Sequence, residues 1–228
     1  MHTVGARQLA LELLHAESFR REDFLANPSN EAALALVDSW PNWPHRIAAI
    51  VGPPGSGKSH LAAIWAEQAG ARITDAAALV RSEVPRALVT GALAIEDLAP
   101  ERADEQALFH LFNLAREEDA YVLVTAAQRT DLDGYTLPDL ASRLRALPVI
   151  ALTPPGDALL AAVMVKLFAD RQLAIDEETV TYLLSRIERS LAAVRDTVER
   201  LDRAALSRGR RITRALAADL LREQESQA

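Results

Sequence analysis

The most informative part of the sequence is the glycine-rich stretch Gly52-Pro53-Pro54-Gly55-Ser56-Gly57-Lys58-Ser59. An apolar run at 47–51 precedes this loop, and a helical pattern that starts at His60 follows it. A glycine-rich loop between a strand and a helix binds phosphate groups, because its backbone N–H groups point inward and the helix N-terminus adds partial positive charge. Lys58 would then reach the β- and γ-phosphates, and the Ser59 hydroxyl would bind Mg²⁺. The sequence predicts a site for a nucleoside di- or triphosphate, with His60 packing at its edge.

The composition limits the class of protein. The chain has 228 residues, 50% of them hydrophobic, no cysteine and a net charge of −7. This length suits one α/β domain with a smaller second one, and the missing cysteines exclude disulfides and thiol catalysis. The acidic balance argues against an extensive nucleic-acid surface, although the basic stretch 208–211 leaves a weak DNA contact open. Without an apolar span or a signal peptide, we expect a cytoplasmic protein that does not bind membranes.

Apolar runs alternate with helical patterns in the first two thirds of the chain. Strands are expected at 47–51, 71–74, 91–95, 120–125 and 149–152, with helices at 31–39, 60–69, 104–118 and 137–146. This alternation predicts an α/β fold with a doubly wound parallel sheet and a ligand at the carboxyl ends of its strands. Ser29 or Asn30 can cap the first of these helices.

A Pro-Pro-Gly sequence at 154–156 marks a boundary, and four helical patterns follow it. Asp176, Ser190 and Thr213 are the expected N-caps of the last three helices. The predicted organisation is therefore an N-terminal peptide at 1–20, a nucleotide-binding base domain at 21–155 and a small all-helical domain at 156–228.

Two acids and two arginines could complete a site for nucleotide hydrolysis. Glu96 and Asp97 follow the strand at 91–95, where carboxylates hold Mg²⁺ and orient the attacking water, although they could also simply end the strand. Arg143 lies between the fourth and fifth strands and could act as an arginine finger in a neighbouring subunit. Arg195, in the helical domain, could reach the phosphates of its own chain. Spacing alone leaves a surface role open for both arginines.

The N-terminal segment Gln8-Leu9-Ala10-Leu11-Glu12-Leu13 alternates apolar and other residues. It can be an edge strand or the start of a helix. It can equally be a linear peptide whose leucines enter a groove of a partner. The pattern alone does not decide between these structures.

Several of these motifs resemble an AAA+ module of the DnaA type, over residues 20–225. The matching residues are Asp23-Phe24-Leu25 with Ser29-Asn30, Gly57-Lys58-Ser59-His60-Leu61, Phe109-His110-Leu111-Phe112-Asn113, Leu140 with Ser142-Arg143-Leu144, and Ala193-Val194-Arg195-Asp196. DnaA initiators continue into a helix-turn-helix domain that binds DNA. This sequence stops after the helical domain and is acidic, so it resembles the Hda family, regulatory inactivators of DnaA, and no sequence-specific DNA binding is expected.

The resemblance implies a P-loop AAA+ base with a five-stranded parallel sheet and an all-helical lid, and it assigns roles to particular residues. In the Hda family an N-terminal peptide binds the sliding clamp of the replicative polymerase. The clamp-binding residues would be Gln8, Leu9, Leu11 and Leu13. The adenine of ADP or ATP would contact Phe24, Leu25 and Asn30. Arg143 would be the box VII arginine finger, and Arg195 would be the sensor 2 arginine. The implied mechanism is that the clamp-bound protein docks on ATP-loaded DnaA and Arg143 completes the hydrolytic site of DnaA, while Asp97 belongs to the catalytic site of its own chain. DnaA is left in its ADP form, which prevents over-initiation.

The sequence departs from the DnaA pattern at two places. Glu96 replaces the usual Asp, and only Thr125 or Gln128 is available as the polar sensor 1 residue after the fourth strand. Weak self-hydrolysis is therefore expected, with the nucleotide acting as a regulatory ligand. An autonomous ATPase such as a helicase loader, or a binding adaptor without hydrolysis, is the alternative, and self-association is left open.

Overall fold

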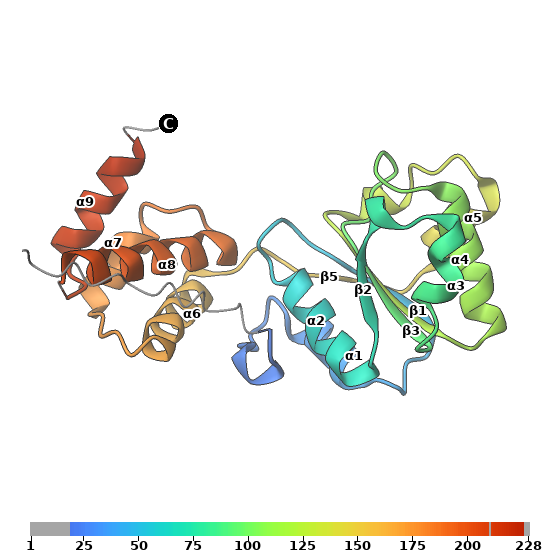
Figure 1. Ribbon diagram of the computed structural model, residues 1–228, viewed down its shortest axis with the longest axis horizontal. Coiled ribbons are helices and arrows are strands. Elements are labelled where there is room, and N and C mark those ends of the chain that lie inside the picture. The colour runs from blue at the N-terminus through green and yellow to red at the C-terminus, as the bar shows by residue number, and fades with distance from the viewer. Residues whose placement is uncertain (1–18, 210, 226–228) are drawn as a thin grey trace, which may run out of the picture. The chain divides into compact units, whose positions relative to one another are not determined.

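The computed structural model describes residues 19–209 and 211–225 (Figure 1). They divide into two compact units, a base unit at Phe19–Gly156 and a helical unit that begins at Asp157. The predicted clamp-binding residues 8–13 lie outside the described residues.

The base unit contains the predicted five-stranded sheet, with strand order β2-β3-β4-β1-β5. All neighbouring strands are parallel. The inner strands β1, β3 and β4 are mainly apolar and buried because helices cover both faces of the sheet, whereas the edge strand β2 carries polar residues. The bounds of the strands are β1 Ile47–Val51, β2 Arg72–Asp75, β3 Ala92–Glu96, β4 Tyr121–Ala126 and β5 Val149–Ala151.

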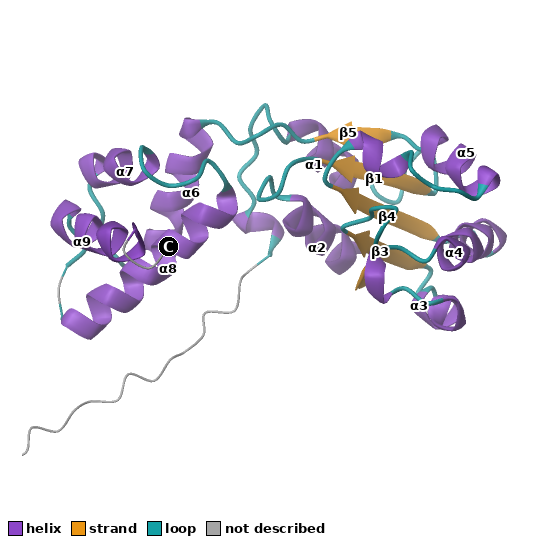
Figure 2. Ribbon diagram, turned by 90° about the horizontal axis from the view of Figure 1, so that it is seen from above, coloured by secondary structure: helices purple, strands orange, loops and turns teal. Residues whose placement is uncertain are grey.

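Helices lie on both faces of the sheet (Figure 2), and each face has its own core of buried side chains. Successive strand residues point to opposite faces, so Ala49 and Val51 belong to one core while Ala48 and Ile50 belong to the other. The first core packs under α3 Val84–Ala87, α4 Glu105–Glu117 and α5 Pro138–Ala146, and the second under α1 Glu31–Asp38 and α2 Lys58–Ala69. Short 3₁₀ helices at Arg21–Asp23, Ala76–Ala78, Arg81–Glu83 and Arg129–Leu132 complete the unit.

The strand order decides which loops meet at the carboxyl edge. Val51, the last residue of β1, pairs with Ala126 at the end of β4. Asp75 at the end of β2 pairs with Glu96 at the end of β3. Since β4 lies between β1 and β3, the loop after β1 and the acids after β3 flank the same strand end.

The helical unit consists of α6 Asp157–Asp170, α7 Glu177–Leu184, α8 Leu191–Arg208 and α9 Arg214–Glu225. The three predicted N-caps are confirmed: Asp176, Ser190 and Thr213 accept hydrogen bonds from the backbone N–H groups of Thr179, Ala193 and Leu216. Buried apolar residues such as Met164, Phe168, Leu183, Val194 and Leu201 form its core. No helix in the described residues is long and apolar enough to cross a membrane.

Helix α1 differs from the prediction at its start. Asn30 occupies the N-cap position, but its side chain makes no capping hydrogen bond. Instead its amide donates to the Leu25 carbonyl at 3.0 Å and its oxygen accepts from the Asn27 N–H at 3.0 Å. The Asn30 side chain therefore uses its amide and its oxygen to fix the preceding loop. The same polar atoms cannot cap α1 at the same time.

Candidate functional site

The glycine-rich loop takes the shape that its sequence requires. Gly57 has φ 102°, in the left-handed region that side chains disfavour. Gly52 lies against the chain that follows β5, where an added Cβ would come within 2.8 Å of the Leu152 Cβ and 2.9 Å of the Ser56 Oγ. Both glycines are therefore needed for a tight turn between β1 and α2.

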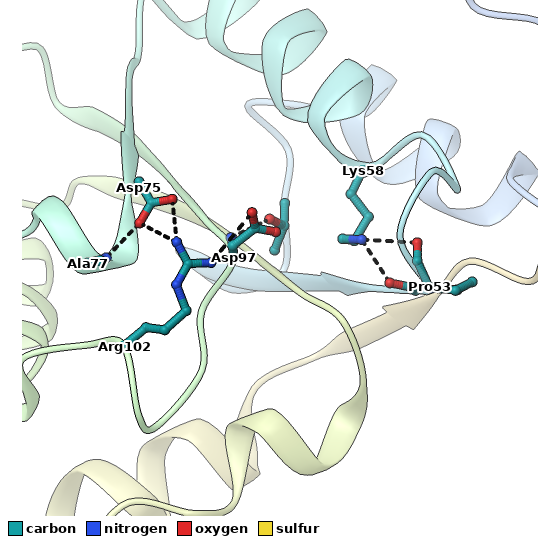
Figure 3. A network of polar contacts seen from close by, with 8 residues as sticks. Pro53, Lys58, Asp75, Ala77, Asp97 and Arg102 are labelled. Carbon is teal, nitrogen blue, oxygen red and sulfur yellow. Dashed lines mark hydrogen bonds and ion pairs between the residues drawn. The ribbon is translucent and has the colours of Figure 1, made fainter. Parts of the chain in front are cut away.

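Lys58 is held inside this loop. Its Nζ donates to the carbonyl oxygens of Gly52 at 2.8 Å and Pro53 at 3.1 Å (Figure 3). Its exposed fraction is only 7%, and this burial lowers the pKa of Lys58, while the charges of Asp97 and Glu96 oppose the shift. An ammonium bound to carbonyls at the mouth of the loop can exchange them for phosphate oxygens.

Asp97, the residue that follows β3, is positioned by β4. Asp97 has φ 53°, a left-handed conformation, and its backbone N–H donates to the Oγ1 of Thr125 at 3.1 Å. Thr125 is fully buried, and its carbonyl accepts from the Leu98 N–H at 2.8 Å. The sequence named Thr125 as one of two polar candidates after the fourth strand, and the structure places it in direct contact with Asp97.

Arg102 is a residue of this edge that the sequence analysis missed. Its Nη2 donates to both carboxylate oxygens of Asp75, at 3.0 and 2.8 Å, and its Nη1 lies 3.7 Å from the Oδ2 of Asp97 (Figure 3). Asp75 also accepts from the Ala77 N–H at 2.8 Å. The signal available in the sequence was the carboxylate of Asp75 at the end of a predicted strand. The pairing of β2 with β3 was needed to show that Asp75 lies near Asp97.

The polar groups of the site fit a nucleotide and Mg²⁺. Ser56 Oγ and Glu96 Oε1 are buried and have no hydrogen-bond partner within residues 19–209 and 211–225. Mg²⁺ takes oxygen ligands, commonly one or two carboxylates together with substrate phosphates, and Ser59, Glu96 and Asp97 supply such oxygens. The described part of the chain holds no cluster of three His, Cys, Asp or Glu side chains suited to binding a metal.

Phe24, one of the residues predicted to contact the adenine, packs against His60 at the start of α2. His60 is buried, as expected, with its ring edge-on to Phe19 and Phe24 at centroid distances of 5.3 and 5.1 Å. Its Nε2 lies 3.1 Å from the carbonyl oxygen of Arg20. The structure thus joins Phe24 and His60 in one cluster beside the loop, while adenine contact by Phe24, Leu25 and Asn30 stays a prediction.

The two predicted arginines belong to different units. Arg143 is half-buried on α5, where its Nη1 donates to the Oδ1 of Asn113 at 2.7 Å and its guanidinium lies 5.1 Å from the centroid of the Phe109 ring. Arg195 lies on α8 of the helical unit. Its action on the phosphates stays a prediction, as does the finger role of Arg143.

The parallel α/β base with a P-loop after β1, together with a helical lid, defines an AAA+ module. Residues 158–221 match the model of the Hda lid domain. The chain is 29% identical over 133 residues, 58% of its length, to the chromosomal replication initiator protein DnaA of Enterococcus faecalis, and the match spans 30% of that protein. The chain is an Hda-like, DnaA-related AAA+ protein.

Solved DnaA structures share the fold. Domain III of Thermotoga maritima DnaA aligns with a TM-score of 0.72 and 18% identity, covering 91% of this chain and 97% of that one. The AMPPCP-bound DnaA of Aquifex aeolicus aligns with a TM-score of 0.63 and 17% identity, covering 81% of this chain and 64% of that one. These similarities confirm the AAA+ fold predicted from the sequence.

Proposed function

We propose that this chain binds an adenine nucleotide and promotes the hydrolysis of DnaA-bound ATP, which prevents over-initiation of chromosome replication. The observation that carries the proposal is an Hda-type lid at 158–221 on a DnaA-related chain whose base unit holds a half-buried arginine, Arg143. DnaA is the natural partner for such a module, because related AAA+ modules can complete one another's nucleotide sites through an arginine supplied in trans.

The nucleotide of this chain, ADP or ATP, would be held by the loop at 52–59. Lys58 and the backbone N–H groups would bind the phosphates, and Ser59, Glu96 and Asp97 would hold Mg²⁺, which neutralises phosphate charge when bound. Phe24, Leu25 and Asn30 would contact the adenine, and Arg195 would act on the phosphates from the lid. We expect this nucleotide to act as a regulatory ligand, since Glu96 is a methylene longer than Asp.

Arg143 would act in the partner. A guanidinium beside the transferring phosphoryl group stabilises the charge that develops on its oxygens, and such a finger contributes a rate factor of about 10³–10⁵. The planar, permanently charged guanidinium suits this role better than an ammonium would. Asp97, by contrast, would serve the nucleotide of its own chain.

The clamp-binding peptide is the third part of the proposal. Gln8, Leu9, Leu11 and Leu13 would bind the sliding clamp through their alternating pattern, with backbone hydrogen bonds supplying affinity and the leucines filling pockets. Clamp binding would concentrate the protein at replicating DNA, and it does not require the base unit to contact DNA.

Two assays test the parts separately. Hydrolysis of ATP bound to DnaA, measured with the clamp present, is expected to be stimulated by the wild-type protein and to fall to the DnaA-alone rate with Arg143→Ala. Retained stimulation would remove Arg143 from the mechanism.

In a pull-down by the clamp, Leu11→Ala combined with Leu13→Ala is expected to abolish capture while leaving ADP affinity unchanged. Undiminished capture would exclude this peptide as the clamp-binding element.

An autonomous ATPase is the second candidate, and one arrangement favours it. Lys58, the two acids after β3 and the buried Thr125 lie at one edge of the sheet, as self-hydrolysis would need. Steady ATP turnover by the purified protein without DnaA, lost on Lys58→Ala, would support this function. Turnover below the stimulated rate of DnaA would favour the regulator.

A further inference from the structure

One face of α4 carries three residues that contact α5 or its start. Glu105, Phe109 and Asn113 are spaced four residues apart, so they lie along the same side of the helix. Two of them contact Arg143, and the third contacts the residues at which α5 begins.

The carboxylate of Glu105 accepts hydrogen bonds from the two residues just before α5. It accepts from the Thr136 N–H at 2.9 Å, from the Thr136 hydroxyl at 3.0 Å and from the Leu137 N–H at 2.8 Å. Leu137 is the N-cap residue of α5 and has no side-chain capping bond of its own. These bonds lower the pKa of Glu105, the Thr136 N–H contributing most. The two residues just before α5 are thus fixed to α4 by a charged acceptor.

Asn113 and Phe109 hold the side chain of Arg143 further along α5. The amide oxygen of Asn113 accepts one N–H of the guanidinium at 2.7 Å, and the Phe109 ring lies under the guanidinium at 5.1 Å. A guanidinium has five N–H donors. The Asn113 bond therefore leaves donors on Arg143 for a further acceptor.

Ordinary helix packing does not require this polar contact. Buried leucines from both helices, Leu108 and Leu111 of α4 and Leu140 and Leu144 of α5, already belong to one core cluster. Such apolar contacts supply most of the stability of a helix pair. An arginine that served packing alone would not need its guanidinium fixed at both its edge and its face.

We propose that Asn113 and Phe109 are positioning residues for Arg143, which fix its guanidinium on α5 before the partner's nucleotide arrives. This inference rests on the proposed function, in which Arg143 acts on DnaA-bound ATP. A free arginine side chain has many rotamers, and ordering it during docking would reduce both affinity and rate. A guanidinium fixed in advance presents its remaining N–H groups at one place.

The test is the rate of hydrolysis of DnaA-bound ATP as the concentration of this protein is raised. Asn113→Ala is expected to lower the maximal rate about tenfold, because misplacing a catalytic group by an ångström can cost up to about a hundredfold. The concentration for half-maximal stimulation is expected to change less than twofold. Gln106→Ala, which removes an exposed polar side chain two turns earlier on α4, is the control and should keep the wild-type rate.

The pattern of loss decides whether Asn113 acts through Arg143. If it does, Asn113→Ala loses less stimulation than Arg143→Ala, which removes the guanidinium itself. An unchanged maximal rate with Asn113→Ala, or a loss that appears only as a higher concentration for half-maximal stimulation, would overturn the inference. If Arg143→Ala itself keeps full stimulation, the proposed role of Arg143 fails as well, which distinguishes the two failures.

Phe109 supplies a second variant that preserves packing. Phe109→Tyr keeps the aromatic ring and should retain the wild-type rate, whereas Phe109→Leu keeps apolar volume without a ring and should lower the maximal rate about threefold. Equal rates for both variants would overturn the role of Phe109. Thermal unfolding of each variant verifies that the chain is folded, so a loss of rate in a folded Phe109→Leu protein supports positioning.

Discussion

Lys58 and Arg143 are the two cations of the base unit on which the proposed chemistry depends, and they are held in different ways. Lys58 is 7% exposed and donates to carbonyls five and six residues earlier in the chain. Arg143 is half-buried and is held by a residue thirty positions earlier, on another helix. The lysine is fixed by its own loop, whereas the arginine is fixed by a tertiary contact.

This difference matches the use we assign to each cation. A site that one chain builds for its own ligand can bury its charge, because the phosphates replace the lost water. A group that serves a second protein must keep donors available, since its acceptor arrives from outside. Variants at the two positions, and at the residues that support them, therefore test whether the two cations have these different roles.

Lys58→Ala should give the largest effect. Removing a buried, charged donor to phosphate is expected to weaken ADP affinity by about 10- to 100-fold, measured by titration with a fluorescent ADP analogue. Lys166→Ala, which removes the only other lysine of the sequence, is the control. Arg143→Ala should leave ADP affinity within twofold, and a comparable loss there would break the distinction between the two cations.

Thr125→Val tests the support of the acid loop. The substitution removes the hydroxyl that accepts the Asp97 N–H at 3.1 Å, and leaving that N–H unpaired is expected to lower the free energy of unfolding by about 1–3 kcal/mol. Denaturant titration measures the change. Thr125→Ser keeps the hydroxyl and should lose less, so an equal loss for Val and Ser would mean that packing of the methyl group is what matters.

Glu105→Gln tests the support of α5. The lowered pKa of Glu105 means that its carboxylate stabilises the folded chain above the ordinary pKa of 4.5, and this contribution is lost as the pH falls through the lowered folded value. At pH 7 the loss is expected to be about 1 kcal/mol, as for other helix caps. Unfolding curves at several pH values should show the difference from wild type shrinking on acidification below 4.5. A difference that stays constant with pH would contradict a role for the charge.

Arg102→Ala should give the smallest effect. The side chains of Arg102 and Asp97 are 41% and 56% exposed, so their ion pair contributes at most about 1 kcal/mol. Releasing Asp97 from this cation is expected to tighten Mg²⁺ binding by the nucleotide complex no more than about fivefold. Arg116→Ala, at an exposed position of α4, is the control. Weaker Mg²⁺ binding would show that Arg102 orients Asp97 for the metal instead of competing with it.

The parts of the fold that follow local rules were predictable. The glycine-rich loop is contiguous, the inner strands are mainly apolar, and the caps Asp176, Ser190 and Thr213 act on N–H groups within three residues. Asn30 shows where such reasoning fails, because its side chain had several local partners and bonded to the preceding loop. The clamp-binding residues 8–13 remain a prediction.

The glycine-rich loop, the parallel α/β class and the place of Glu96 and Asp97 at the end of a strand could be predicted from the sequence, since each depends on neighbours in the chain and on strand periodicity. The contacts of Arg102 with Asp97, of Thr125 with the Asp97 N–H and of Asn113 with Arg143 depend on the tertiary structure. These pairs are separated by up to thirty residues, and strand order and helix packing bring them together. No local pattern encodes such a distance, so the contact between Asn113 and Arg143 could be found only from the packing of α4 against α5.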